Sequence, residues 1–341
     1  MKEENKVVSF EGVDLYRGDC LEVMRTLPDK SVNLIVIDPP YNIGKDKRWD
    51  KWKTVNAYVA FMGEVFLECQ RLLKDNGSFY FFHNDFLQIV ELQNWLNKNS
   101  KFVFKQLITI TKSNNSFIKD LYGSQEHFRN YININEYCLY YTFQDETGLT
   151  TIMLDVNNFS NLRRYFKEMQ EFLNVNKKQI IEQVGQSADH CFRWGSSQWA
   201  LPTEKTYDKL IEEFNINLWD EFKSYEELRN KYEELCNKYE ELRYTFNEKS
   251  GEVNTWEFNF KSKNKYKHPT QKPILLIEKI LKASSHEGDV VLDCFLGSGT
   301  TAVACVNTNR RCIGIERDDK YFDVSCTRVD EAINKPDAEL F

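Results

Sequence analysis

The sequence predicts an α/β fold in which helices cover both faces of a mostly parallel β-sheet. Short apolar runs alternate with helical patterns between residues 13 and 82, and the same alternation returns between residues 274 and 333. The stretch 150–262 interrupts it with aromatic, Asn-rich sequence that contains a helical repeat. We therefore expect one sheet domain built from residues 1–149 and 263–341, and an inserted helical domain at 150–262.

The first elements of the sheet domain come from residues 13–37. Residues 13–19 alternate apolar and polar side chains and end in Gly-Asp, as a short strand does. Residues 20–28 have helical spacing that Pro28 closes. The run VNLIVI at 32–37 is continuously apolar, which is typical of a strand buried on both faces.

The segment DPPY at 38–41 ends that strand, because its two prolines cannot donate backbone hydrogen bonds. Apolar residues then recur at helical spacing over 56–74, and Asn76-Gly77 is expected to stop the helix before a strand at 78–82. This β–α–β order favours parallel strands.

The C-terminal part repeats the pattern. A helix is predicted at 274–284, a buried strand at 290–293 and, after a glycine-rich turn, a helix at 300–308. A strand at 311–316 and a closing helix at 318–333 complete the chain.

The inserted segment contains the repeat YEELRNK-YEELCNK-YEELRYT, which predicts a helix over 225–245. Its tyrosines and leucines recur at alternating spacings of three and four, which is a heptad pattern. They are Tyr225, Leu228, Tyr232, Leu235, Tyr239 and Leu242. The helix either packs on its own domain or forms a coiled coil in a homodimer, and the pattern leaves both open.

Composition excludes several classes of protein. No apolar run is long enough to span a membrane, and the N-terminus lacks the apolar core of a secretion signal. The nine cysteines are scattered without a CxxC pair, which argues against a metal site and fits the reducing cytoplasm. The net charge is −7, but five lysines and no acid lie between 261 and 272, so local DNA binding stays open.

The turn Asp293-Cys-Phe-Leu-Gly297-Ser-Gly299-Thr300 lies between a predicted strand and a helix. Glycines there let a ligand approach the backbone, and Glu316 at the end of the next strand can accept both hydroxyls of a ribose. A phosphate-binding P-loop would need a lysine after Gly299, and a dinucleotide site would need GxGxxG. Two interpretations of the turn remain, a site for a nucleoside cofactor without a pyrophosphate and a purely structural turn.

Asp38-Pro39-Pro40-Tyr41 lies where open α/β folds bind ligands, at the carboxyl end of a strand. The Asp38 carboxylate and the Pro39 carbonyl can accept both N–H groups of an exocyclic amine, while Tyr41 stacks on the ring. This segment, the later HPTQKP and DCFLGSGT together resemble the β class of DNA amino-methyltransferases, over residues 13–142 and 265–330.

The resemblance implies a class I, Rossmann-like sheet of seven strands, circularly permuted, with a helical target-recognition insert. Such a sheet needs an acidic strand beside the strand at 311–316. Because no strand is predicted after residue 316, this neighbour would be the strand at 13–19, which ends in Asp19. The resemblance also implies S-adenosylmethionine as cofactor and double-stranded DNA as substrate, with the target base flipped out of the duplex.

Site residues follow from the same resemblance. The methionine end of the cofactor would be lined by Phe295, Gly297, Ser298, Gly299 and Thr300, with Asp38 close by. Asp293 would bind its amino group, Glu316 the ribose hydroxyls and Asp19 the adenine. Thr270 and Lys272 would lie near the cofactor carboxylate, although Lys272 could equally reach a DNA phosphate.

Asp as the first residue of DPPY favours adenine N6 as the acceptor, with cytosine N4 as the alternative. RNA or a protein amide are remoter substrates, and a non-catalytic DNA-binding protein that dimerises through the heptad helix is a different class of function. Two positions depart from the family, since Ile110-Thr111 replaces an aromatic before Lys112, and Asn135 replaces a histidine before Glu136.

The insert would read DNA, because sequence recognition needs surface that reaches base edges. Besides Trp194 and Trp199, which could equally be core residues, the candidate contacts are Arg193, Gln198, Lys261, Lys263, Lys265 and Lys267. A separate cognate restriction endonuclease is a further expected partner, with a solitary methylase as the alternative.

Overall fold

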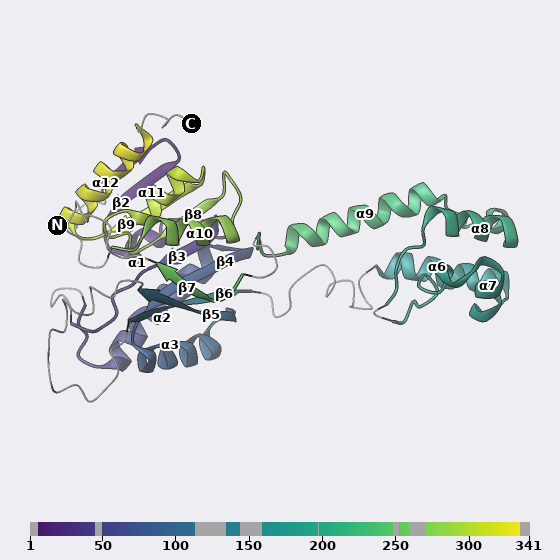
Figure 1. Cartoon of the computed structure of the whole chain (residues 1–341), viewed down its shortest axis with the longest axis horizontal. Helices are drawn as coiled ribbons and strands as arrows, with labels where there is room; N and C mark the ends of the chain where they lie inside the picture. Colours follow the sequence, from purple (N-terminus) through teal and green to yellow (C-terminus); the bar gives the residue numbers. More distant parts are fainter. Residues whose placement is uncertain are drawn as a thin grey trace. The chain divides into compact units, whose positions relative to one another are not determined.

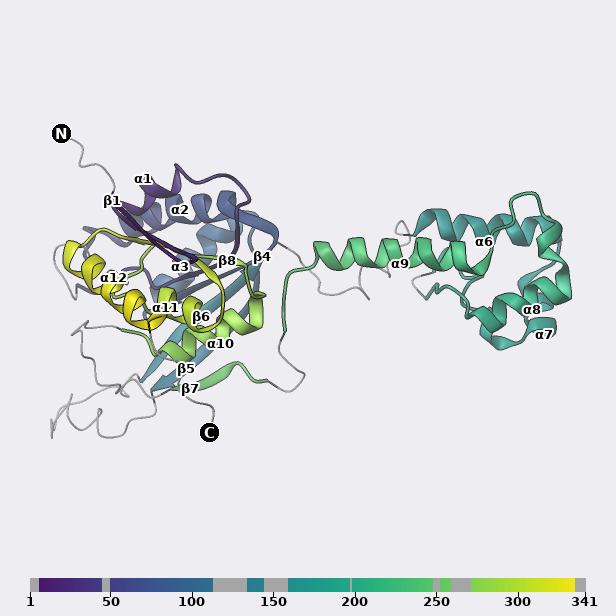
Figure 2. The same ribbon diagram turned by 90° about the horizontal axis from the view of Figure 1, so that it is seen from above.

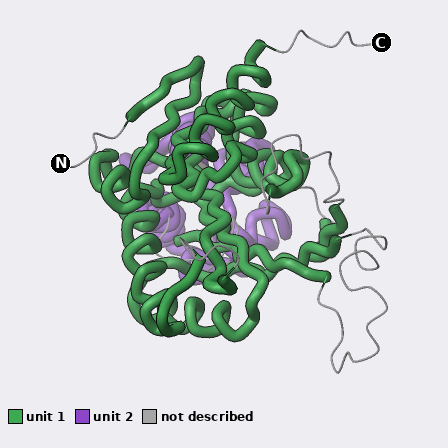
Figure 3. Tube along the Cα trace, turned by 90° about the vertical axis from the view of Figure 1, so that its left-hand side faces the viewer, with its two compact units in different colours: residues 1–145, 244–341 green, residues 146–243 purple. Residues whose placement is uncertain are grey.

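The computed structural model describes residues 6–44, 50–112, 134–143, 159–196, 198–247, 252–258 and 271–334 (Figure 1). The chain divides into two compact units, Met1–Asp145 with Tyr244–Phe341, and Glu146–Arg243 (Figure 3). The insert therefore ends before residue 244 and not at 262 as expected, because β7 (Thr255–Phe258) pairs with β5 and joins the sheet. No helix among the described residues is long and apolar enough to cross a membrane.

Unit 1 is built on a sheet with the order β1-β2-β9-β8-β3-β4-β6-β5-β7. Its strands are β1 (Lys6–Phe10), β2 (Val13–Arg17), β3 (Val32–Ile37), β4 (Leu73–His83), β5 (Val103–Lys112), β6 (Asn135–Thr142), β7, β8 (Val290–Asp293) and β9 (Arg311–Glu316). Strands from β2 to β4 are parallel, and β6 runs antiparallel to both of its neighbours.

The described sheet thus has nine strands where seven were expected. The seven from β2 to β5 form the predicted class I arrangement, and each edge of it gains one strand. β1 is the antiparallel partner of β2 across a two-residue turn, and β7 is contributed by the chain returning from unit 2. Neither of these strands of five and four residues was predicted.

Helices cover the two faces of this sheet in separate groups (Figures 1 and 2). One face packs against α1 (Cys20–Met24), α2 (Val55–Leu72) and α3 (Phe86–Asn99). The other packs against α10 (Ile274–Ser284), α11 (Thr300–Asn307) and α12 (Asp319–Ile333). Alternate residues of β3 go to opposite cores, Ile35 and Ile37 to the first and Leu34 and Val36 to the second, which explains its continuous apolar run.

The two ends of the chain meet as predicted. β2 pairs in parallel with β9, with Arg17 opposite Glu316. β3 pairs with β8 on the other side, Leu34 opposite Val291. The strands that precede DPPY and the glycine turn are therefore direct neighbours, although most of the chain separates them in sequence.

One local expectation was wrong. Asn76-Gly77 does not stop a helix, because α2 already ends at Leu72 and β4 runs through both residues. A register shift between β3 and β4 absorbs the irregularity. A side chain at position 77 would lie within 2.9 Å of the Asn33 carbonyl, so glycine is required by the close approach of the two strands.

Unit 2 is helical, with α6 (Ser160–Leu173), α7 (Lys177–Val184), α8 (Glu204–Phe214) and α9 (Tyr225–Leu242) around its own core. α9 is the heptad helix, and its Leu228 is only 1% exposed. Tyr225, Tyr232 and Leu235 pack against the same core. This part of the heptad pattern thus reflects packing within unit 2, which is the first of the two interpretations above.

Candidate functional site

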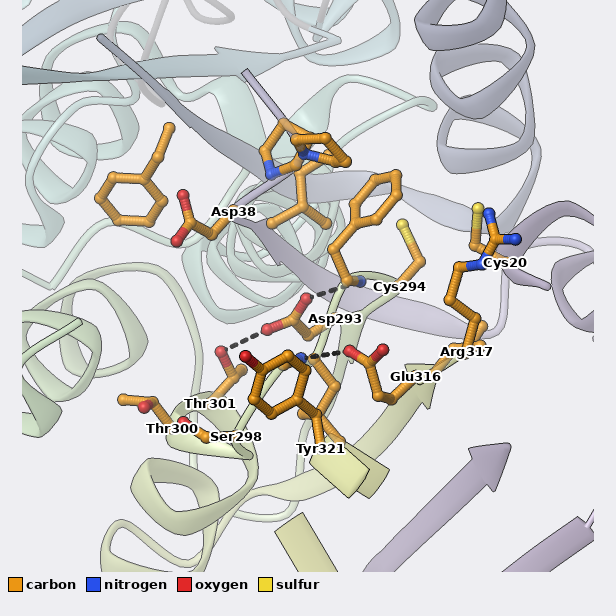
Figure 4. A pocket seen from close by; sticks show the side chains of 18 of the residues that line it. Cys20, Asp38, Asp293, Cys294, Ser298, Thr300, Thr301, Glu316, Arg317 and Tyr321 are labelled. Carbon is orange, nitrogen blue, oxygen red and sulfur yellow. Dashed lines mark hydrogen bonds between the residues drawn. The ribbon is translucent and has the colours of Figure 1, made fainter. Parts of the chain in front are cut away.

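A cavity of about 310 Å³ opens in unit 1 at the carboxyl ends of the parallel strands. Asp38 and Gly297, from the two motifs, both line it. Figure 4 shows Asp38, Asp293 and Glu316 around this one cavity, with Tyr321 and Arg317 at its wall. The two motifs therefore form a single site.

The glycine turn needs its glycines for backbone reasons. Gly297 and Gly299 have φ angles of 55° and 84°, which favour glycine. A Cβ on Gly299 would also lie 2.8 Å from Ser325 Cβ of α12. Buried Arg328 of the same helix donates to the Ser298 carbonyl at 2.6 Å and to the Thr300 hydroxyl at 3.3 Å. α12 therefore holds the turn in place.

Two carboxylates, of buried Asp293 and half-buried Glu316, face the cavity from the ends of β8 and β9. Asp293 accepts from the Thr301 hydroxyl at 2.6 Å and from the Phe295 N–H at 3.0 Å. Burial nevertheless raises the pKa of Asp293 to about 7. Burial likewise raises the pKa of Glu316 to about 7. The backbone N–H groups of Asp318 and Gly297 each donate to this carboxylate at 2.7 Å and lower its pKa, but burial has the larger effect. A ligand that is cationic or donates hydrogen bonds would stabilise their ionised forms.

Asp19 also lines the cavity, at the end of β2. Its Oδ1 accepts from the Leu21 N–H at 3.0 Å and caps α1, so helix formation fixes its position. Phe295 lies against the ring of Phe61 of α2, with centroids 6.4 Å apart. Together with the glycine turn, these side chains surround a space with acidic and aromatic walls.

The DPPY segment carries an ion-pair cluster that was not anticipated. Lys272 Nζ lies 2.7 Å from Asp38 Oδ2 and 3.3 Å from Glu136 Oε2, and it donates to the Tyr41 hydroxyl at 3.1 Å. Its side chain is 5% exposed. Lys272 thus lies beside Asp38, and a buried ammonium in that place cannot be a surface contact to a DNA phosphate.

Charge balance accounts for this cluster. Glu136 also pairs with Lys112 at 2.7 Å. Burial alone would raise the pKa of Glu136, but Lys272 and Lys112 lower it to about 2. Burial would lower the pKa of Lys272, but Asp38 and Glu136 raise it. Both groups are therefore charged at neutral pH.

Sequence reasoning missed Glu136 and Arg328 as parts of the site. Glu136 was noticed only as a departure beside Asn135, and Arg328 has helical spacing like any surface arginine. A buried-charge argument could have linked Glu136 to a lysine, but no pattern shows which lysine.

The proposed DNA contacts in unit 2 are bonded to other side chains of that unit. Arg193 pairs with Asp189 and donates to the Gln198 side chain, so both candidates are held by intramolecular contacts in unit 2. Trp199 is 3% exposed and belongs to the core, while Trp194 is half-buried. The remaining DNA candidates lie outside the described residues: Lys261, Lys263, Lys265 and Lys267. So does Thr270, which was predicted to lie near the cofactor carboxylate.

Residues 32–326 match a protein family described as DNA methylase, whose members modify N6 or N4 amines. The chain belongs to this family. Among curated relatives, the methylase is 26% identical to the DNA adenine methyltransferase YhdJ of Escherichia coli, over 97% of this chain and 87% of that one. It is also 26% identical to the Type II methyltransferase M.HpaI of Haemophilus parainfluenzae, over 93% of this chain and 74% of that one.

Solved structures agree on the fold. The M1.HpyAVI complex with SAM aligns with a TM-score of 0.51 and 19% identity, over 93% of this chain and 98% of that one. The cytosine-N4-specific PvuII DNA methyltransferase aligns with a TM-score of 0.55 and 12% identity, over 95% and 93%. The methylase is therefore a class I methyltransferase in architecture.

S-adenosylmethionine is the cofactor of this methylase, and the cavity fits it chemically. The cavity holds the Asp293 and Glu316 carboxylates, which suit an ammonium group and ribose hydroxyls, and aromatic walls that suit an adenine. The buried Gln271 Oε1, also in its wall, has no hydrogen-bond partner among the described residues. An acceptor buried in this way needs a donor, which a polar ligand supplies.

Proposed function

We propose that this DNA methylase transfers a methyl group to N6 of adenine in duplex DNA, by flipping the target base out of the helix. The observation that carries the proposal is the single cavity that brings the Asp38 carboxylate to the glycine turn. An amine held at Asp38 then faces the cofactor held at the turn. When bound there, S-adenosylmethionine supplies an electrophilic methyl group on a sulfonium.

The chain's own residues would prepare the amine. Its lone pair is delocalised into the base and is a poor nucleophile. Hydrogen bonds from both N–H groups to Asp38 and the Pro39 carbonyl favour a pyramidal nitrogen whose lone pair points at the methyl group. Tyr41 would stack on the base, and Lys272 holds the Asp38 carboxylate in place by donating to its Oδ2 at 2.7 Å. Asp38 takes the amine proton only once the nitrogen has become cationic.

The cofactor assignments follow the geometry of the cavity. Asp293 would bind the amino group, Glu316 the ribose hydroxyls and Asp19 the adenine edge. Phe295 and the turn at 297–300 would line the methionine end. All of these residues except Gly299 line the same cavity.

Adenine is proposed over cytosine for two reasons. The first motif residue is Asp38 rather than serine, and the relative YhdJ is named a DNA adenine methyltransferase. Cytosine N4 is the second candidate, because it also presents two N–H groups next to a ring nitrogen. Target reading is assigned to unit 2, where Arg193 and Gln198 would need to exchange their present partners for base edges.

Three experiments test this function. Nucleoside mass spectrometry of DNA from cells expressing the protein should show N6-methyladenine, and modification-sensitive sequencing should place it in one sequence motif. N4-methylcytosine instead would overturn the choice of base and keep the reaction. Asp38→Ala should abolish methylation while cofactor binding survives, and comparable turnover would overturn the assigned role of Asp38.

A further inference from the structure

The backbone of the DPPY turn is held from α2 by a tyrosine that lies behind it. The Tyr58 hydroxyl is 2.8 Å from the Pro40 carbonyl oxygen and 3.1 Å from His83 Nε2. Tyr58 and His83 are both 0% exposed. Neither residue belongs to a motif that the sequence singled out, and neither lines the cavity among its described residues.

The direction of each hydrogen bond in this group can be worked out. The Asp85 backbone N–H donates to His83 Nδ1 at 3.1 Å, so Nδ1 carries no proton. Burial lowers the pKa of His83 to about 4 despite Asp85, so the ring is neutral and its proton is on Nε2. Nε2–H must then donate to the Tyr58 oxygen, which leaves the Tyr58 O–H to donate to the Pro40 carbonyl.

His83 also supports the next residue of the turn. Its ring lies against the ring of Tyr41, with centroids 4.8 Å apart and planes tilted by 34°. The Tyr41 carbonyl accepts from the Gln88 side chain of α3 at 3.1 Å. The Tyr41 ring therefore has His83 against it, and the Tyr41 backbone is tied to α3.

We propose that Tyr58 and His83 are positioning residues for methyl transfer, because their hydrogen-bond chain fixes the peptide plane of Pro40 and the ring of Tyr41. Each proline fixes its own φ, so the course of the turn depends on the ψ angles of Pro39 and Pro40. Pinning the Pro40 carbonyl limits those angles. The Pro39 carbonyl, one peptide earlier, is then held where the amine must find its second acceptor.

This inference rests on the proposed function, and it has an activity test. Tyr58→Phe and His83→Asn should each lower the single-turnover rate of methyl transfer to undermethylated bacterial DNA by about 10- to 100-fold, since small misplacements in an active site cost that much. Cofactor affinity by calorimetry should stay within about twofold, because neither side chain faces the cofactor end of the cavity.

The double variant tests whether the two residues act as one chain. It should be no slower than the slower single variant, since breaking a chain twice adds nothing. Tyr141→Phe is the matched control, because it removes another buried hydroxyl, bonded to Gln93, from the same hydrophobic cluster and should leave the rate unchanged. Multiplied single effects, or an equal loss in Tyr141→Phe, would overturn the proposal.

A spectroscopic readout separates this proposal from the proposed function. Nitrogen-15 NMR of the histidine rings, with the His83 signal assigned by its loss in His83→Asn, should show the proton on Nε2 and no titration between pH 5.5 and 8. A proton on Nδ1, or a titration midpoint near pH 6.5, would refute the chain. If the wild type transferred no methyl group, the function would fail while this measurement still decided the hydrogen-bond chain.

Discussion

Substituting Asp293 by asparagine gives the sharpest test of the cofactor map. Burial holds the pKa of Asp293 at about 7, so roughly half of these carboxyls are ionised at pH 7 and about a tenth at pH 6. Binding the cofactor's ammonium group requires the ionised form. Asp293 should therefore release about half a proton on binding at pH 7, and should strengthen affinity roughly fivefold between pH 6 and pH 7.

Asp293→Asn keeps the shape of the side chain and removes this linkage. Cofactor affinity at pH 7 should fall about 10- to 100-fold, as for the loss of a charge-assisted hydrogen bond. Calorimetry in buffers of different ionisation enthalpy measures the released protons. The variant should release about half a proton less than the wild type, while any contribution of Glu316 or of the ligand itself is common to both.

Asp289→Asn is the control. Asp289 directly precedes β8 and Asp293 is the last residue of β8, so the two acids lie at opposite ends of the same strand. It should bind the cofactor as the wild type does. Equal proton release and equal pH dependence in Asp293→Asn and the wild type would refute the assignment of Asp293 to the amino group.

Two further predictions concern stability. Lys272→Met should lower the free energy of unfolding by about 3–5 kcal/mol in urea titrations, because Glu136 would stay buried with one cation fewer. Lys178→Met, which removes an exposed ion pair with Glu182, should change it by less than about 0.5 kcal/mol. Leu228→Ala should lower the free energy of unfolding of unit 2 by about 2–5 kcal/mol, and this loss should not depend on protein concentration. Leu218→Ala is the control, because Leu218 is 74% exposed and its loss should leave this free energy almost unchanged. A concentration-dependent loss in Leu228→Ala would point instead to a dimer contact.

The sequence predicted the central sheet well, because the patterns that mark its strands lie within short stretches of the chain. Continuous apolar runs marked β3 and β8, and the DPPY and glycine turns marked the strand ends that carry the site. The order of β2 beside β9 was predicted from the class I sheet that the resemblance implies, in which the strand at 311–316 needs an acidic strand beside it. The place of the site followed from the rule that ligands bind at strand ends.

The missed features depend on tertiary contacts that have no local pattern. Lys272 could be assigned to a motif, but its partners Asp38 and Glu136 come from distant strands. β7 is a half-exposed strand of four residues that is defined by its pairing with β5. Tyr58 and His83 look like core residues of a helix and a strand, and only their mutual distances give them a role.

The chemistry of the site depends chiefly on one strand pairing. Asp38 follows β3 and Asp293 ends β8, and these parallel strands are hydrogen-bonded neighbours, Ile35 opposite Leu292. Neighbouring strands lie about 5 Å apart, so this pairing by itself brings Asp38 and the glycine turn within reach of one another. Unit 2 lies in the sequence between β6 and β7, beyond this pair, and none of its described residues lines the cavity. Under the proposed assignment of target reading to unit 2, substitutions there should change which DNA sequence is modified without changing how the methyl group is transferred.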